Sequence, residues 1–304
     1  MKINRAERNG GIILKENTVG ELTFLTFPAF EKCGLVEHLF TTRFGGVSEG
    51  IYASMNLSFS RGDDKEHVME NYRRVAEVLG CKVEDMAATR QTHTTNIRVV
   101  TAKDRGKGVV RATDYEDIDG LVTNEPGIAL AAFYADCVPL YFVDVEHKAI
   151  GLAHSGWRGT VKQMGACMVE TMKREFATRP EKLLAAIGPS ICKECYEVDD
   201  TVAEEFVRML QGSEEVLEEI RESGCYFAPD TPCGQVVERG RRAGKYQLDL
   251  WLANLIILRR AGIPLANISV TDICTCHNPE YLFSHRASQG KRGNLGAFLM
   301  LKNI

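Results

Sequence analysis

Three residues whose side chains can bind a metal or act as a nucleophile lie at the edges of β-like runs. His93 stands in RQTHTTN, Cys137 follows AAFYAD, and His154 ends the run AIGLA before Ser-Gly. Ends of neighbouring strands can meet although they are far apart in the sequence. Two imidazoles and one thiolate would form a zinc site with an open fourth position, which is the composition of catalytic zinc sites. Such a zinc ion holds water and lowers its pKa toward about 7.

The same residues have two other interpretations. Cys137 would be the nucleophile of a hydrolase if His154 or His93 served as its base. It would be a core thiol, beside two structural histidines, if it only packed as a small hydrophobic residue. The spacing by itself leaves all three interpretations open.

Two glycine-containing turns carry an arginine. HSGWRGT places Arg158 at the start of a predicted helix, and TTRFGGVS places Arg43 before two glycines. Free amides at a helix start, together with a guanidinium, form an anion site. A tight turn with a solvated arginine is the other interpretation.

The tail LFSHRASQGKRGN combines polar side chains with glycines. His285, Arg286, Lys291 and Arg292 would belong to a loop that closes over an anionic or polar ligand. A solvated basic loop explains the same composition.

Two short cysteine motifs, CKEC at 192–195 and CTCH at 274–277, resemble half-sites for a structural zinc ion. The second motif is Cys-x-Cys-His rather than Cys-x-x-Cys, and the intervening stretch is much longer than a zinc-ribbon loop. Buried or incidental thiols are therefore the favoured interpretation here.

The elements that must position these residues follow from periodicity and turn residues. The sequence predicts helices over 64–80, 157–176, 200–212 and 248–262, with Asp63 or Asp64 as the first N-cap and Gly80 just past that helix. It predicts β-strands within 10–30, 96–101, 117–136, 139–155, 183–190, 267–275 and 295–302, with turns at Asp119-Gly120 and Pro126-Gly127. Strands and helices mix without a βαβ rhythm, which favours an α+β fold over a doubly wound sheet.

The composition indicates a globular protein. The chain has 304 residues, 44% of them hydrophobic and 26% charged, and no linker divides it, so we expect a single domain over residues 1–304. A net charge of −4 gives no electrostatic reason to expect nucleic-acid or anionic-membrane binding. The start has no secretory pattern and no run is long enough to span a membrane, so we expect a cytoplasmic protein whose ten cysteines are reduced.

Taken in order, these motifs resemble the YfiH family, also called the laccase-domain or multicopper polyphenol oxidase-like family. The resemblance rests on TTRFGGVS, QTH, DGLVT, ADCVPL, AHSGWRG, IGPSIC followed by CYEV, LDL, CT and FSHR followed by GKRGN. It covers nearly the whole chain, although residues 1–40 add little to it. It implies a layered α/β/β sandwich with mixed sheets, distinct from Rossmann folds.

The resemblance also implies a metal site made by His93, Cys137 and His154. Blue copper requires a weak axial ligand, usually Met, and laccases need more histidines than the seven present, none in a His-x-His pair. Zinc is therefore the expected metal, with copper as the less favoured one.

The family's activity implies a zinc-dependent purine nucleoside phosphorylase. Adenosine, inosine, guanosine or methylthioadenosine would react with phosphate to give the base and a pentose-1-phosphate, and adenosine would also be deaminated. The alternatives are a Cys-dependent amidase or hydrolase acting on a peptidoglycan precursor, a copper-dependent polyphenol oxidase, and a binding protein without activity. The expected partners are nucleosides and phosphate, with no nucleic acid and no membrane, in a monomer or small homo-oligomer.

Within that activity the candidate residues have separate roles. Cys137, Asp136 and Arg158 are the candidate catalytic residues, with Asp136 as a proton carrier beside the ligand. Phosphate, ribose or other substrate groups would contact Arg43, Gln91, Arg158, His285 and Arg286, and Gln91 would also orient His93.

Three segments depart from the usual family pattern: SMNLSFSRGDD, ENYRR, and TTN after His93. They lie near the expected nucleoside pocket and leave the preferred nucleoside open.

Overall fold

The structure is a computed structural model that describes residues 3–6, 13–226 and 235–303. Its strands are β1 Lys15–Val19, β2 Leu22–Thr26, β3 Val36–Thr41, β4 Met86–Ala88, β5 Ile97–Val99, β6 Gly120–Thr123, β7 Ala129–Tyr134, β8 Val138–Asp144, β9 Ala149–Ser155, β10 Leu183–Ile187, β11 Glu197–Asp199, β12 Val237–Arg239, β13 Lys245–Leu248, β14 Ile268–Val270 and β15 Leu295–Leu301. Its α-helices are α1 Pro28–Cys33, α2 Lys65–Leu79, α3 Trp157–Val161, α4 Met164–Phe176, α5 Asp200–Met209, α6 Glu214–Ser223 and α7 Leu250–Arg260.

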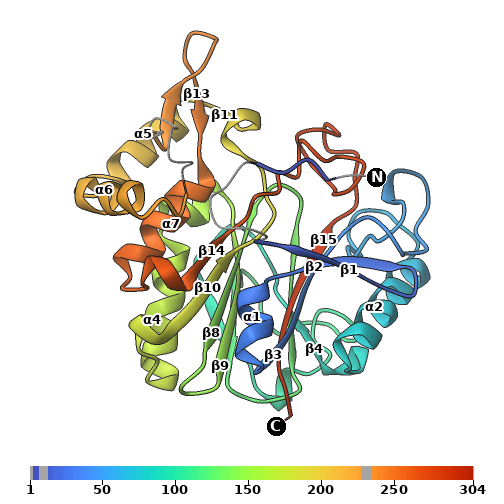
Figure 1. The fold of residues 1–304 in the computed structure, drawn as a ribbon. Coiled ribbons are helices and arrows are strands. Elements are labelled where there is room, and N and C mark those ends of the chain that lie inside the picture. Colours follow the sequence, from blue (N-terminus) through green and yellow to red (C-terminus); the bar gives the residue numbers. More distant parts are fainter. Residues whose placement is uncertain (1–2, 7–12, 227–234, 304) are drawn as a thin grey trace.

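Two six-stranded mixed sheets form the centre of the fold (Figure 1). One has the strand order β1-β2-β3-β15-β7-β4 and the other β14-β10-β8-β9-β6-β5. A small sheet, β11-β13-β12, lies beside α5 at one end. Mixed sheets of this kind confirm the predicted α+β class and its distinction from a Rossmann fold.

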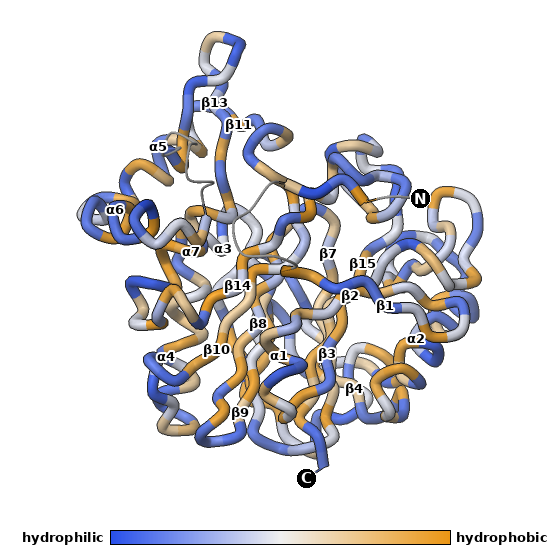
Figure 2. The backbone as a smooth tube through the Cα atoms, viewed as in Figure 1, coloured by the Kyte–Doolittle hydropathy of each residue, from blue (hydrophilic) through white to orange (hydrophobic). Residues whose placement is uncertain are grey.

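Side chains alternate between the layers. Leu130 of β7, Leu299 of β15, Val143 of β8 and Leu152 of β9 belong to one core cluster between the two sheets. Helix α2 covers the outer face of the first sheet, and α4 and α7 cover the outer face of the second. The central strands β8, β9 and β10 are strongly hydrophobic, whereas peripheral turns and α6 are largely hydrophilic (Figure 2). The layered sandwich is therefore closed by helices on both sides.

Helix α2 matches its prediction closely. Its N-cap is Asp64, whose side chain accepts a hydrogen bond from the amide of Glu66, and Gly80 ends it with a φ of 68°. The strands predicted around 139–155 are β8 and β9, with Lys148 at a φ of 50° in their turn. Residues 10–12 of the first predicted strand region lie outside the described residues.

Two predictions are wrong. The helix predicted over 157–176 is two helices, α3 and α4, separated at Gln163, which has a φ of 59°. Buried contacts of Thr160 with Ser155 and Asn254 fix α3 against β9 and α7, so the chain must turn before α4 can pack. Asp119-Gly120 is not a turn, because Gly120 begins β6. Helix α6 and strands β3, β12 and β13 were not predicted, although Val216, Leu217 and Ile220 give α6 a helical spacing of hydrophobic residues. Among the described residues, no helix has the length and hydrophobicity needed to cross a membrane.

Candidate metal centre

Three segments bring His93, Cys137 and His154 together. His93 lies in the loop between β4 and β5, Cys137 at the corner between β7 and β8, and His154 on β9. One ligand atom from each residue lies within 4.8 Å of the other two, and the two imidazole rings meet edge to face at 4.9 Å between centroids. His154 is buried, Cys137 half-buried and His93 exposed, so one side of the group faces solvent. The ends of distant strands therefore converge as predicted.

The corner at Cys137 depends on unusual backbone conformations. Asp136 has a φ of 88° and His93 a φ of 67°, in the left-handed region that most residues avoid. Strands β8 and β9 then pair with Pro139 opposite His154, which places His154 near the corner. Non-glycine residues in this region often occur at functional sites, where surrounding contacts hold them.

Gly156 allows the close approach of the ligands. A Cβ at this position would lie 2.9 Å from Cδ2 of His93 and 3.1 Å from Sγ of Cys137. Because the φ of Gly156 is −69°, its backbone suits any residue, and the requirement for glycine is one of space.

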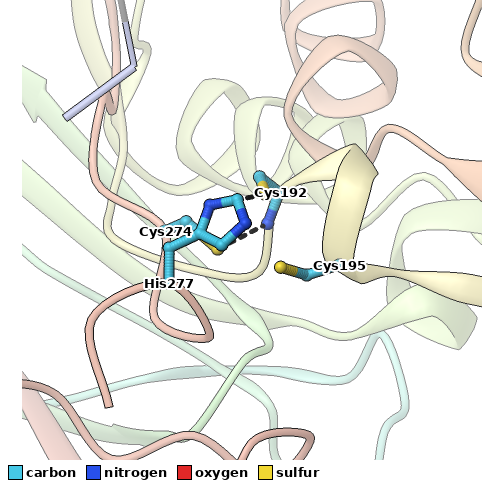
Figure 3. Close-up of side chains that lie close together, drawn as sticks. All are labelled: Cys192, Cys195, Cys274 and His277. Atoms are coloured by element: carbon cyan, nitrogen blue, oxygen red, sulfur yellow. Dashed lines mark hydrogen bonds between the residues drawn. The ribbon is translucent and has the colours of Figure 1, made fainter. Parts of the chain in front are cut away.

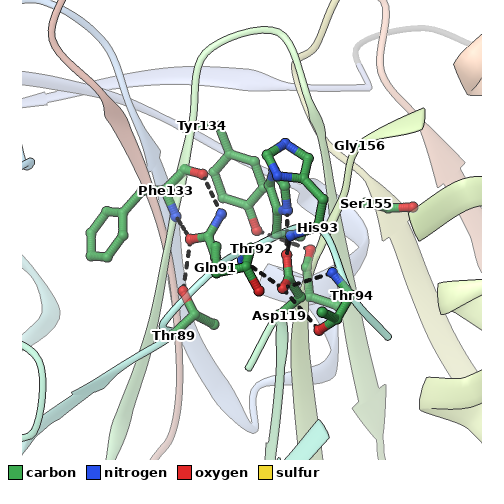
Figure 4. A network of polar contacts seen from close by, with 12 residues as sticks. Thr89, Gln91, Thr92, His93, Thr94, Asp119, Phe133, Tyr134, Ser155 and Gly156 are labelled. Carbon is green, nitrogen blue, oxygen red and sulfur yellow. Dashed lines mark hydrogen bonds and ion pairs between the residues drawn. The ribbon is translucent and has the colours of Figure 1, made fainter. Parts of the chain in front are cut away.

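Asp119 is the residue that sequence reasoning missed. Its side chain is fully buried, and its carboxylate accepts hydrogen bonds from the backbone amides of Thr92, His93 and Thr94 (Figure 4). The same carboxylate lies 2.8 Å from Nδ1 of His154. It thus fixes both histidines and leaves Nε2 of His154 for a metal or for Cys137. The sequence did contain a signal for this role, because in DGLVT the acidic residue Asp119 directly precedes a strongly hydrophobic run.

Cys137 and His154 perturb each other electrostatically. Burial alone would raise the pKa of Cys137, but the charges of and hydrogen bonds from His154 and His93 lower it from 9.0 to about 6. Burial would lower the pKa of His154, whereas the Cys137 charge and the Asp119 hydrogen bond raise it from 6.5 to about 9. The thiolate, which is both a metal ligand and a nucleophile, is therefore the favoured form at neutral pH.

The three residues open into a cleft of about 790 Å³. This volume is in the range of small-molecule sites. Residues 57–61, 89–93, 108–109 and 111–113, together with Phe133, line much of it. The first of these segments lies within SMNLSFSRGDD, residues 54–64, which departs from the usual family pattern.

Arg61 and Arg292 provide positive charge in this cleft. Arg292 is only 8% exposed, and its buried Nε has no hydrogen-bond partner among the described residues. Burial and the nearby charge of Arg61 lower the pKa of Arg292 from 12.5 to about 10. A pair of close guanidinium groups, one of them incompletely paired, suits an anionic ligand.

Gln91 lines the cleft, but its side-chain amide does not hydrogen-bond to His93. Its Nε2 donates to the carbonyl of Phe133, and its Oε1 accepts from the amide of Phe133 and the hydroxyl of Thr89 (Figure 4). The orientation of His93 is instead supported by Asp119.

Asp136 uses both carboxylate oxygens for structure. One accepts a hydrogen bond of 2.6 Å from the hydroxyl of Thr275, and the other one of 2.7 Å from the amide of Arg286. Asp136 therefore anchors the corner that carries Cys137, and its role as a proton carrier stays a prediction.

The other predicted residues do not line this cleft. Arg43 donates to the carbonyls of Ala53 and Pro279 and lies over the ring of Phe283. Arg158 lies over its neighbour Trp157.

His285 and Arg286 lie in the tail loop. Nδ1 of His285 is 3.4 Å from Nη2 of Arg292, so His285 lies beside a cleft arginine. Arg286 donates to the carbonyls of Cys195 and Glu197.

A two-sheet sandwich with a His/Cys/His group at the strand ends defines the class of this protein. A family model described as "Multi-copper polyphenol oxidoreductase laccase" matches residues 37–302, so the chain belongs to this family. This finding confirms the resemblance drawn from the sequence motifs.

Individual relatives carry names that specify an activity. The chain is 36% identical over 264 residues to "Purine nucleoside phosphorylase YlmD" of Bacillus subtilis, covering 86% of this chain and 87% of that protein. It is 32% identical over 253 residues to "Adenosine deaminase RL5" from an unknown prokaryotic organism, covering 83% and 88%. The crystal structure of YlmD from Geobacillus stearothermophilus matches with a TM-score of 0.83 at 35% identity, over 96% of this chain and 99% of that one.

Proposed function

We propose that this protein is a zinc-dependent purine nucleoside phosphorylase that also deaminates adenosine. The observation that supports this proposal most is the convergence of His93, Cys137 and His154 at the wall of a nucleoside-sized cleft. Arg61 and Arg292 also line this cleft. One relative is named for the phosphorylase activity and another for the deaminase activity, which supports the same assignment. Adenosine, inosine, guanosine and methylthioadenosine are the proposed substrates.

The donor set fits zinc. Two imidazoles and one thiolate match a catalytic zinc site with an open position, and the Asp119 contact fixes the tautomer of His154 as in carboxylate–histidine–zinc arrangements. Zinc bound there supplies a Lewis acid and a water of lowered pKa. The copper that the family description suggests would require further histidine ligands or a weak axial ligand.

The cleft residues have separate tasks in the two reactions. In phosphorolysis a phosphate oxygen forms a bond to C1′ of the ribose while the C1′–N9 bond breaks, and the base leaves with the electron pair and takes a proton. Arg61 and Arg292 would hold the phosphate, and Phe133 would pack against the purine. In deamination water adds at C6 and ammonia leaves, so no phosphate site is needed.

A product assay tests the proposal. Purified, zinc-loaded protein is incubated with adenosine or inosine, with and without phosphate, and products are separated by chromatography. We expect hypoxanthine and ribose-1-phosphate from inosine only when phosphate is present, and inosine from adenosine in either case. Absence of all these products with zinc bound would refute the assignment.

Two matched variants locate the phosphate. Arg61→Gln should raise the KM for phosphate about tenfold or more and leave deamination nearly unchanged. Arg158→Gln removes the exposed arginine of the turn predicted from sequence and should leave both activities intact. A raised KM for phosphate in Arg158→Gln, with an unchanged KM in Arg61→Gln, would show that phosphate binds at that turn instead.

A cysteine hydrolase is the second candidate, because Cys137, His154 and Asp119 also form a nucleophile–base–carboxylate series. Its substrate would be an amide, such as one in a peptidoglycan precursor. Activity that survives complete metal removal but is lost on thiol alkylation would favour this candidate over the zinc enzyme.

A further inference from the structure

A second group of metal-binding side chains lies outside the cleft. Cys192 and Cys195 follow β10, in a segment that includes the short 3-10 helix Lys193–Cys195, and Cys274 and His277 follow β14. Strands β10 and β14 are parallel neighbours, so their carboxyl ends meet at one edge of the sheet. The amide of Thr275 donates to the carbonyl of Ser190 at 3.1 Å, which joins the two following loops.

The four side chains converge from these two loops (Figure 3). One ligand atom from each of Cys192, Cys195, Cys274 and His277 lies within 4.8 Å of the others. We call these four residues the Cys3His group. Cys192 and Cys274 are buried, Cys195 is half-buried and His277 is exposed.

The spacing of the ligands is more regular than the sequence motifs suggested. The motif CTCH offers Cys274, Cys276 and His277 as possible ligands, and the structure groups Cys274 and His277 with the first pair. Both halves then have two residues between their ligands, Cys192-x-x-Cys195 and Cys274-x-x-His277, which is a common spacing in structural zinc sites. The long intervening stretch is no obstacle, because β10 and β14 are adjacent in the sheet.

Backbone amides support one sulfur of this group. The amide of Cys192 donates to Sγ of Cys274 at 3.3 Å, and the amide of His277 bonds to the same sulfur. Sγ of Cys192 lies 3.7 Å from Nδ1 of His277. Hydrogen bonds of this kind orient ligands around a metal and stabilise a thiolate.

We propose that Cys192, Cys195, Cys274 and His277 bind a second zinc ion, in a closed tetrahedral site separate from His93, Cys137 and His154. Three thiolates and one imidazole fill all four positions, so this zinc would be structural rather than catalytic. The three bound thiolates leave the site with net negative charge. The Arg286 guanidinium, bonded to the carbonyl of Cys195, places a positive charge beside it.

The second zinc ion would stabilise the corner that carries Cys137. The loop after β10 donates the amide of Ile191 to the carbonyl of Asp136 at 3.0 Å. The loop after β14 and the tail hold the Asp136 carboxylate through Thr275 and Arg286. A zinc ion that joins these loops would therefore restrict the position of Asp136, next to the proposed catalytic ligand.

Metal stoichiometry tests the inference without reference to activity. Native mass spectrometry and elemental analysis of the full chain, purified under reducing conditions and dialysed against a weak chelator, should give about two zinc ions per chain. Cys195→Ser and His277→Gln should each lose one, and Cys137→Ser should lose the other. A wild-type protein that retains zinc only at Cys137, or variants with unchanged zinc content, would overturn the proposal.

Cys276→Ser is the matched control. Cys276 lies in the same loop but outside the Cys3His group, so this variant should keep both zinc ions. Loss of zinc from this variant would contradict the ligand set. Because His277 is exposed, His277→Gln should fold even if a cysteine variant does not.

Two further measurements distinguish a zinc ion bound by the Cys3His group from a disulfide between its cysteines. Cobalt substitution of Cys137→Ser should still give tetrahedral absorption bands with strong thiolate charge transfer, since three thiolates remain around the metal. A mass two hydrogens lower under denaturing, non-reducing conditions, insensitive to chelator, would show a disulfide instead and refute zinc binding. Failure of the nucleoside assay would leave all these outcomes unaffected.

Discussion

At the scale of single residues, Asp119 joins the two histidines of the candidate metal site. A buried carboxylate is costly unless its oxygens are bonded, and here the loop 92–94 and His154 satisfy them. These contacts, with the His154 hydrogen bond as the leading favourable one, lower the pKa of Asp119 below 3.8 although burial opposes this. The same charge therefore positions two ligands from separate segments.

Asp119→Asn should weaken zinc binding at His93, Cys137 and His154 by about 10- to 100-fold. The amide nitrogen of asparagine would meet N–H donors that now bond to a carboxylate oxygen. Zinc affinity, measured by competition with a chromophoric chelator, checks this.

Asp117→Asn is the control for that change. Asp117 is exposed, and its carboxylate accepts a hydrogen bond from the hydroxyl of Thr92 at the edge of the same loop. Equal losses of affinity in the two variants would show that Asp119 has no special role.

Gly156→Ala should reduce the nucleoside activity about a hundredfold and lower zinc content, because the added methyl group displaces His93 and Cys137. Gly159→Ala is matched, since the nearest atom to its added Cβ, the carbonyl oxygen of His154, is 3.6 Å away. Kinetics and zinc analysis of both variants provide the check. Normal activity in Gly156→Ala would mean that the ligands do not need this close approach.

At the scale of elements, the walls of the cleft depend on charge pairs in irregular segments. Asp104 is buried, and it accepts hydrogen bonds from Arg98 at 2.7 Å and Lys107 at 2.7 Å. These bonds hold the segment 98–114, part of which lines the cleft. Burial alone would raise the pKa of Asp104, but hydrogen bonds from Arg98 and Lys107 lower it from 3.8 to about 2.

Asp104→Asn should therefore lower the free energy of unfolding at pH 7 by about 1–2 kcal/mol, a figure reduced by solvent around Arg98. Because the folded pKa lies below the unfolded value, the contribution of Asp104 is complete above pH 3.8 and is lost as the pH falls through about 2. Urea unfolding from pH 7 down to pH 2 should show the difference between variant and wild type closing.

Asp114→Asn gives the comparison, since Asp114 also contacts Lys107 but its side chain is 65% exposed. This change should have little effect on stability at any pH. A difference for Asp104→Asn that stays constant down to pH 2 would contradict the assigned role of its charge.

At the scale of the whole molecule, two tyrosines connect the sheets through the core. The hydroxyl of Tyr141 on β8 donates to the carbonyl of Leu39 on β3 at 3.2 Å, and that of Tyr134 on β7 donates to the carbonyl of Ala153 on β9 at 2.9 Å. Both side chains are almost fully buried. The hydrogen bonds therefore fix the sheets relative to each other.

Tyr141→Phe and Tyr134→Phe should each lower the free energy of unfolding by about 1 kcal/mol, since each loses one buried hydrogen bond and keeps its ring. Thermal and urea unfolding measure the effect. The double variant should show nearly additive losses, because the two bonds share no partner. No loss in either single variant would mean that these bonds do not stabilise the sandwich.

Much of the fold could be predicted from local pattern. Helix α2, with Asp64 and Gly80 at its ends, and strands β8 and β9 follow from periodicity and turn residues within a few positions. The break at Gln163 could not be predicted, because it depends on buried contacts between Thr160 and a helix almost a hundred residues later.

The sequence by itself identified the candidate metal ligands: the residue types and motifs of His93, Cys137 and His154 singled out this group. Only the tertiary structure decided how those residues are supported, by the buried Asp119 and the close approach at Gly156. It also placed Arg61 beside Arg292 of the predicted tail loop in the lining of the cleft, left Arg43 and Arg158 outside it, and grouped Cys274 with His277. The physical reason is that strands and helices follow from neighbours a few residues apart, whereas these arrangements follow from which strands lie side by side.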